Sequence, residues 1–196
     1  MFLIIRTYSI IFLLSVVLMG CAANMTAKKR TEVRLPANSR IAVLPFENLS
    51  GTEYAAEKIT DYFQTMMSAQ MRFETVDFGK VYDGLRDYRI RTASQLTDSQ
   101  IDSLTSRLQV NYLLLGSVLE YEEHDNNYLG RLPQVSFNCR LLDCKTHKIL
   151  WVATSNGRGD KGEFVFGIGA IRSADNLSRK MVQDAVNDIT GIFNKK

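Results

Sequence analysis

The strongest constraint on the fold is a segment in which polar and apolar residues alternate, beginning at Gln134 within a stretch that ends at Asp143. Successive side chains of a β-strand point to opposite faces of the sheet, so this pattern predicts a half-exposed strand over residues 134–143. The residues expected on its buried face are Val135, Phe137, Cys139 and Leu141. Those expected on the other face are Gln134, Ser136, Asn138 and Arg140.

Other segments have the composition of strands. A tight turn over residues 144–148 leads into an apolar stretch, Ile149 to Ser155, so these two strands are expected to form a hairpin. Residues 40–46 and the first half of residues 112–122 are continuously apolar, as expected for strands covered on both faces. Pro45 cannot donate a ladder hydrogen bond and is expected to mark the end of the earlier strand.

Helical periodicity separates these strands. Apolar residues recur at spacings of three and four over residues 53–71 and 173–193, which predicts two amphipathic helices. Thr97 and Gln100 have the spacing of a capping box, so a further helix is expected to begin there. Weaker patterns predict a short strand over 72–77 and a short helix over 80–88.

The element order is therefore β-α-β-α-α-β-β-β-α, without an internal repeat or a second linker. This order predicts the α/β (α+β) class: a single three-layer domain over residues 39–196, with a mixed sheet of about five strands flanked by helices.

The N-terminus has the features of an export signal. Residues 1–20 carry a single charge, Arg6, followed by an apolar run over 10–19 that is shorter than the roughly 20 residues of a membrane-spanning helix. Leu18-Met19-Gly20-Cys21 resembles the bacterial lipobox. That resemblance implies cleavage between Gly20 and Cys21 and lipidation of Cys21. A buried N-terminal helix with a chance cysteine is the alternative.

The lipobox resemblance also implies a location. Ala22 in the second mature position is similar to the outer-membrane sorting choice, which places the chain at the periplasmic face of the bacterial outer membrane. Residues 21–38 lack an apolar period and are expected to form a lipidated flexible tether.

Three segments carry a resemblance to a known group of proteins. They are Ile41-Ala42-Val43-Leu44-Pro45-Phe46-Glu47-Asn48-Leu49-Ser50, Asn111-Tyr112-Leu113-Leu114-Leu115-Gly116-Ser117-Val118, and Leu141 to Trp151 with its Asp-x-x-Thr turn. In this order they resemble the CsgG / LpoB / TolB N-terminal-domain-like superfamily of bacterial envelope proteins. Cys144, His147 and the pair Val110-Asn111 depart from the family's pattern at turns. The shared residues suggest a fold and an envelope setting, and they point to no chemistry.

Composition and motifs offer little support for catalysis. A formal charge of +3 provides no electrostatic footprint for nucleic acid. The two histidines, His124 and His147, are expected at the surface, without partners at metal-ligand spacing, and no G-x-S-x-G elbow is present. We therefore expect no catalytic residue, no metal and no cofactor. Residues 157–162 match G-x-G-x-x-G by letter, but a mobile loop over 157–172 is the expected structure there.

A disulfide between Cys139 and Cys144 is not expected. Five strand residues separate them by roughly 16 Å, far beyond the usual Cα distance, and their opposite parity places them on different faces. Cys139 is expected in the core, and Cys144 as a free or intermolecular thiol.

The function that these observations favour is protein binding. We expect an outer-membrane-anchored lipoprotein, not an enzyme, that binds an envelope protein in envelope assembly, secretion or cell-wall synthesis, with a homo-oligomer left open. The acidic run over 120–125 and the basic Arg172, Arg179 and Lys180 are either solvated faces or a partner surface. A CsgG-type channel subunit is the alternative, and a periplasmic enzyme a distant one.

The channel alternative is disfavoured by chain length. Residues 120–133 are few, acidic and interrupted by Gly130 and Pro133, so they are not expected to form a membrane hairpin. Residues 157–172 contain one short apolar run without a return strand.

The lipid on Cys21 is expected to be the only membrane attachment. Cys21→Ala removes the acylated atom, so the variant should be recovered in the soluble fraction after carbonate extraction, whereas the wild-type chain stays with the membrane. Variant protein that remains fully membrane-bound would contradict this expectation.

Overall fold

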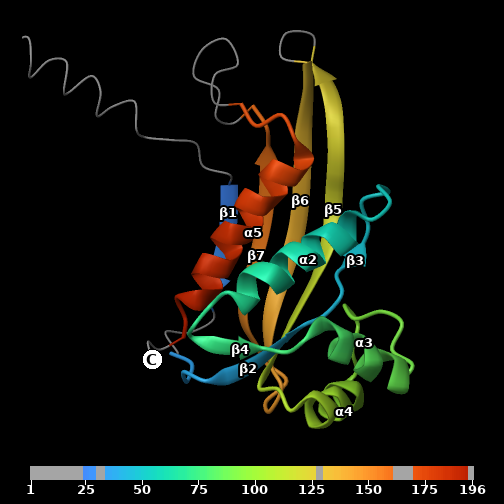
Figure 1. The fold of residues 1–196 in the computed structure, drawn as a ribbon, viewed down its shortest axis with the longest axis vertical. Coiled ribbons are helices and arrows are strands. Elements are labelled where there is room, and N and C mark those ends of the chain that lie inside the picture. The colour runs from blue at the N-terminus through green and yellow to red at the C-terminus, as the bar shows by residue number, and fades with distance from the viewer. Residues whose placement is uncertain (1–23, 30–33, 127–129, 161–169, 194–196) are drawn as a thin grey trace, which may run out of the picture.

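One mixed sheet organises the chain (Figure 1). The structure, a computed structural model, describes residues 24–29, 34–126, 130–160 and 170–193, so the expected signal peptide, Gly20 and Cys21 lie outside the described residues. The strands are β1 (Asn24–Lys29), β2 (Ser39–Val43), β3 (Glu47–Asn48), β4 (Phe73–Thr75), β5 (Tyr112–Asn126), β6 (Gly130–Asp143) and β7 (Ile149–Arg158). The strand order is β1-β7-β6-β5-β2-β4, and β3 pairs with β5.

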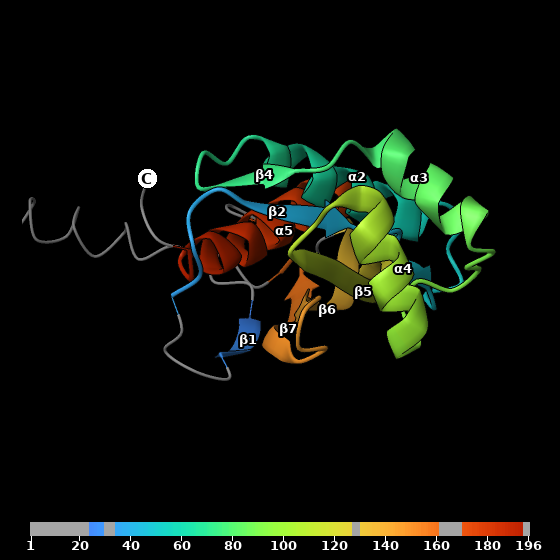
Figure 2. The same cartoon turned by 90° about the horizontal axis from the view of Figure 1, so that it is seen from below.

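Two helices lie on each face of the sheet. They are α2 (Ala55–Ser68), α3 (Phe78–Asp87), α4 (Asp98–Leu108) and α5 (Ala174–Thr190). One buried cluster joins α2 and α5 to the sheet, and a second joins α3 and α4 to the opposite face of β2 and β5. Figure 2 shows α5 and α4 on opposite sides of β5. The three-layer α/β class and the element order are confirmed, and β1 and β3 are added to the five expected strands.

The alternation in β6 is confirmed as a burial pattern. Its four apolar positions are at most 1% exposed, and all belong to the cluster under α2 and α5. On the neighbouring strand Trp151 is fully buried, and its Nε1–H donates to Asp188 Oδ2 of α5 at 2.6 Å. The capping box at α4 is also present, with the Thr97 side chain accepting from the Gln100 backbone N–H.

A bulge in β5 directs a tyrosine toward α5. The register with β6 shifts between Val118 and Glu120, so Leu119 is the extra residue and is partly exposed. The shift brings Tyr121 to the same face as Val118, and its hydroxyl donates to Asp175 Oδ1 at 2.5 Å. Burial and this carboxylate raise the pKa of Tyr121. The phenol therefore stays neutral and ties β5 to α5.

The two strands predicted over residues 112–122 and 134–143 extend farther toward each other than expected. β5 continues to Asn126 and β6 begins at Gly130, so these residues extend the hairpin. Pro133 is tolerated because its carbonyl accepts from Gly159 N–H at 2.9 Å, on the side away from β5. In an antiparallel strand the N–H and C=O of one residue point the same way, so no β5 hydrogen bond is lost at this proline.

The expected tether is likewise interrupted by structure. Within residues 21–38, β1 pairs antiparallel with β7, and Leu35 is buried, with its backbone N–H donating to the Ile192 carbonyl at 2.9 Å. A strand added to a sheet edge is held by backbone hydrogen bonds, which require no apolar period in its sequence. A strand over residues 24–29 is therefore compatible with their lack of apolar periodicity.

Replacing Phe137 should cost much of the domain's stability. Its ring is fully buried and packs edge-on against Phe63 with centroids 5.7 Å apart. We expect Phe137→Ala to lower the free energy of unfolding in urea by about 3–5 kcal/mol. Thr154→Ala, at an exposed position of β7, is the control and should change it by less than about 0.5 kcal/mol. A loss below about 1 kcal/mol at Phe137 would contradict the packing described.

Candidate functional site

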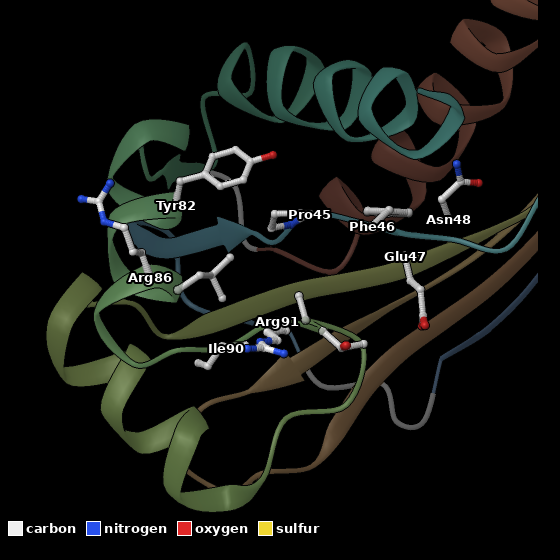
Figure 3. Close-up of a pocket in the computed structure, with 11 residues that line it drawn as sticks. Pro45, Phe46, Glu47, Asn48, Tyr82, Arg86, Ile90 and Arg91 are labelled. Carbon is white, nitrogen blue, oxygen red and sulfur yellow. The ribbon is translucent and has the colours of Figure 1, made fainter. Parts of the chain in front are cut away.

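A cavity of about 450 Å³ opens between α3, the loop after it and the segment that leaves β2 (Figure 3). Its lining residues are Pro45, Phe46, Glu47, Asn48, Tyr82, Leu85, Arg86, Ile90, Arg91, Thr92 and Ala93. A second hollow of about 270 Å³ shares Pro45, Phe46, Asn48 and Tyr82 with the first, and adds Tyr54, Ala56, Glu57 and Thr60 of the α2 side. We call these two joined hollows the tyrosine groove.

The floor of the groove is fixed by Phe46. Its backbone N–H donates to Thr60 Oγ1 at 3.0 Å, and its ring stacks on Phe63 with centroids 5.0 Å apart. A Cβ on Gly116 would lie 2.1 Å from this ring and 2.6 Å from the Asn138 carbonyl oxygen. Only glycine lets β5 pass beneath Phe46, which explains the glycine in one of the three segments that carry the family resemblance.

The loop beside the groove is held by one side chain. Asn48 Oδ1 accepts from the backbone N–H of Ser50 at 3.1 Å, and its Nδ2 donates to the Thr52 carbonyl at 2.8 Å. Gly51 has a φ of +77° and Tyr54, directly before α2, has a φ of +60°. These two left-handed residues turn the chain sharply and leave Tyr54 projecting at the surface.

Two tyrosines form the rim. Tyr54 is 58% exposed and Tyr82 47%, although both border the groove. Tyr82 projects from α3 toward α2 across Pro45 (Figure 3). Burial, followed by Glu57 and Asp61, raises the pKa of Tyr82, and a hydrogen bond with Glu53 raises that of Tyr54. Both phenols are therefore neutral and amphipathic, as in protein-binding surfaces.

The walls of the groove differ in charge. Arg86 and Arg91 line the α3 side and are exposed, the neighbouring Arg89 is exposed but lies outside the lining, and Arg86 is paired with Asp83 at 2.6 Å. Neither Arg89 nor Arg91 forms an ion pair within the described part of the chain. The α2 side carries Glu57, which lines the groove and helps to raise the pKa of both tyrosines. A ligand in the groove thus meets a basic side and an acidic side.

His147 lies in the β6–β7 turn, as expected, and it makes contacts that no local pattern indicated. Its Nε2 lies 2.9 Å from Asp102 Oδ1 and its Nδ1 3.4 Å from Asp98 Oδ1. The Asp102 carboxylate is the main cause that raises the pKa of His147. The contact joins the β6–β7 turn to α4. The side chain of His124 lies outside the described residues, but its backbone belongs to β5 and not to a loop.

The two cysteines are separate and buried. Cys139 and Cys144 are free thiols in different core clusters, as their opposite parity predicted. Cys144 is only 3% exposed, which argues against its expected alternative as an intermolecular thiol. Burial raises the pKa of both, that of Cys144 to about 11, so neither forms a thiolate readily.

The glycine-bearing segment is built for close packing. A Cβ on Gly157 would lie 2.4 Å from Met181 Sδ, and one on Gly159 would lie 2.1 Å from the Ile171 carbonyl oxygen. The next described helix begins at Ala174, so no helix opens within these glycines as a dinucleotide site requires. Residues 161–169 of the expected loop lie outside the described residues.

Charged residues of α5 do not line the groove. Arg179 stacks on the Tyr62 ring at 4.5 Å, and Asp175 pairs with Lys58 at 3.1 Å. Among the residues that the structure describes, no group of three or more His, Cys, Asp or Glu side chains could hold a metal ion. Within the same residues, no helix has both the length and the hydropathy to cross a bilayer.

The fold of this α/β domain is similar to that of solved bacterial proteins, a lipoprotein among them. Lipoprotein GNA1162 from Neisseria meningitidis matches with a TM-score of 0.55 and 20% identity, over 78% of this chain and 99% of its own. PelC from Paraburkholderia phytofirmans, a dodecamer, matches with a TM-score of 0.55 and 15% identity, over 88% of this chain and 100% of its own.

A weaker likeness is to the C-terminal domain of LpoB from Escherichia coli, with a TM-score of 0.47 and 15% identity over 63% of this chain and 84% of that domain. No family model and no curated protein matches the sequence. The envelope-lipoprotein fold that the resemblance implied is confirmed by the first two structures, and at these identities the likeness concerns the fold alone.

The His147 contact should make stability depend on pH. The folded-state pKa of His147 is raised above its usual 6.5, so the stabilisation is fully present below that value and is lost as the pH rises through the raised pKa. We expect the wild type to exceed His147→Asn in unfolding free energy by more at about pH 5.5 than at about pH 8.5.

Asparagine suits this comparison because it tolerates the left-handed backbone of position 147, where φ is +54°. Urea unfolding of both proteins at the two pH values measures the effect. A difference that is constant with pH, or that grows toward alkaline pH, would contradict the assignment of a protonated His147 between two carboxylates.

Proposed function

We propose that the chain is an outer-membrane-anchored periplasmic lipoprotein, not an enzyme, that binds another envelope protein through the tyrosine groove. The observation that carries this proposal is the pair of half-exposed tyrosines, Tyr54 and Tyr82, over an apolar floor. Tyrosine is enriched at protein interfaces because its ring buries apolar area while its hydroxyl keeps a polar partner.

The proposed anchoring is supported by the sequence and by the fold. Leu18-Met19-Gly20-Cys21 is similar to a lipobox, and the domain shares its fold with lipoprotein GNA1162. In this proposal Cys21 carries the lipid, cleavage falls between Gly20 and Cys21, and the domain over residues 39–196 lies in the periplasm.

The charges of the groove indicate the chemistry of its occupant. Arg89 and Arg91 are exposed cations on the α3 side, whereas Glu57 belongs to the α2 side. We assign to the groove an extended segment of the partner with an apolar anchor between the tyrosines and an acidic residue facing Arg91. Opposite charges set at the rim favour one orientation of such a segment over its reverse.

A second copy of this chain is the alternative occupant. PelC, whose fold this chain shares, is a dodecamer, so a homo-oligomer is the arrangement that the comparisons favour beside a different partner. The mass of a cross-linked product separates the two, since a second copy gives multiples of the chain's own mass.

Site-specific photo-crosslinking tests the groove in the native envelope. A benzophenone amino acid in place of Tyr82 should give one product of fixed mass, and mass spectrometry should place the adduct in an acidic segment of the partner. Arg91→Glu should reduce its yield about tenfold, because charge reversal at a partly desolvated contact costs on the order of 1–2 kcal/mol.

The matched control is the same probe at Met71, which is 85% exposed and does not line the groove. Equal products from positions 71 and 82 would refute the groove as the binding site. A product at multiples of the chain's own mass would replace the proposed partner by a second copy.

A further inference from the structure

We propose that Ser94 sets the charge preference of the tyrosine groove, because its hydroxyl binds Glu47, the carboxylate that would otherwise compete with the partner for Arg91. The inference rests on the proposed binding function and deepens it, since it names the residue that lets the groove accept an acidic segment. Ser94 does not itself line either hollow of the groove. It is therefore a positioning residue, which acts through Glu47 and Arg91.

The groove contains a carboxylate beside its cation. Glu47 of β3 and Arg91 both line the larger hollow, and these two described side chains form no ion pair with each other. A carboxylate free to turn within this hollow would pair with the guanidinium, because opposite charges attract even where they are partly exposed. An acidic residue of the partner would then meet a neutralised wall.

The hydroxyl of Ser94 holds this carboxylate in place. It donates to Glu47 Oε2, and both residues are partly buried. The Glu47 side chain points from β3 toward the loop after α3, which carries Ser94 (Figure 3). A hydrogen bond to an ionised acceptor is stronger than one between neutral groups. Glu47 is thus directed at Ser94, and Arg91 stays available to a ligand.

A second contact fixes the position of Ser94 itself. Arg140 of β6 donates from Nη2 to the backbone carbonyl of Ser94. Glu47 is the register partner of Ser117 on β5. Arg140 is the register partner of Leu115, two residues earlier on the same strand, so Glu47 and Arg140 lie on one face of the sheet. Ser94 is therefore held from two strands, one on either side of β5.

The two contacts use different groups of Ser94 and can be separated by substitution. Ser94→Ala removes the hydroxyl but leaves the carbonyl that Arg140 binds. Glu47→Gln removes the charge but leaves an oxygen that can accept from Ser94. The double variant loses the hydroxyl and the competing charge together. If the loop were displaced by Ser94→Ala, the second substitution would not reverse the effect, so the pair distinguishes release of Glu47 from displacement of the loop.

Charged thiol reagents measure the availability of Arg91 without the partner. The purified full chain carries Thr92→Cys, at an exposed lining position next to Arg91. This thiol is treated at low ionic strength with a sulfonate-bearing and with an ammonium-bearing methanethiosulfonate. The ratio of the two rates reports the local charge. The parent chain is the control for the remaining thiols, because Cys139 and Cys144 are buried.

We expect Ser94→Ala to lower the sulfonate-to-ammonium rate ratio about threefold, because Glu47 then pairs with Arg91. Glu47→Gln should raise the ratio more in the Ser94→Ala chain than in the chain that keeps Ser94. Ser103→Ala, which removes an exposed hydroxyl bound to the Ser99 carbonyl of α4, is the matched control and should leave the ratio unchanged. A ratio unaffected by Ser94→Ala, or an equal effect of Glu47→Gln in both chains, overturns the proposal.

Photo-crosslinking from position 82 connects this result to the partner. In the native envelope Ser94→Ala should reduce the yield of the adduct severalfold, and the double variant should regain the parent yield. An adduct at position 82 no stronger than that at Met71 refutes the proposed function, and the rate ratios then still decide the role of Ser94. A normal yield in a Ser94→Ala chain whose rate ratio has fallen overturns the proposed charge preference.

Discussion

The pairing of β5 with β6 is the interaction on which the rest of the structure depends. It runs from Tyr112–Asp143 to Asn126–Gly130, so both strands are aligned over nearly their whole length. β2 and β3 add to the free edge of β5 in parallel, and β7 and β1 follow on the edge of β6. The alternation in β6 determines which face receives α2 and α5, because a one-residue slip would turn every apolar side chain of that strand to the other side.

The parts of the fold that could be predicted from sequence are those encoded by local periodicity. The β6 pattern, the capping box at Thr97 and the four-residue spacing in α5 each lie within one element, so a single chain shows them. β1 was not predicted because it is held at the sheet edge by backbone hydrogen bonds, which leave no apolar pattern in its sequence. The extension of the β5–β6 hairpin was not predicted because glycine and proline, here Gly130 and Pro133, usually end strands. Pro133 is accommodated only because its missing donor faces away from β5.

The candidate site could not be predicted because it is made by residues distant in sequence. His147 meets Asp102 across a separation of 45 residues, and Tyr82 meets Pro45 through the packing of α3 on β2. The residues of the family resemblance act on the site indirectly. Gly116 leaves room for the Phe46 ring, and that ring in turn forms the floor between Tyr54 and Tyr82. A motif that indicates only a fold therefore also shapes the groove.

The pairing of β1 with β7 brings the groove close to the proposed lipid anchor. β3, which borders the groove, pairs with Ser117 and Val118, only two to three residues below the level at which Asn24 enters β1. Because Cys21 precedes Asn24 by three residues, the groove lies within roughly 20 Å of the residue proposed to carry the lipid. A partner anchored in the same membrane meets it at a high effective concentration, whereas a partner that must span the periplasm gains nothing from so short a linker. The paired β1 thus favours partners that are themselves held at the outer membrane.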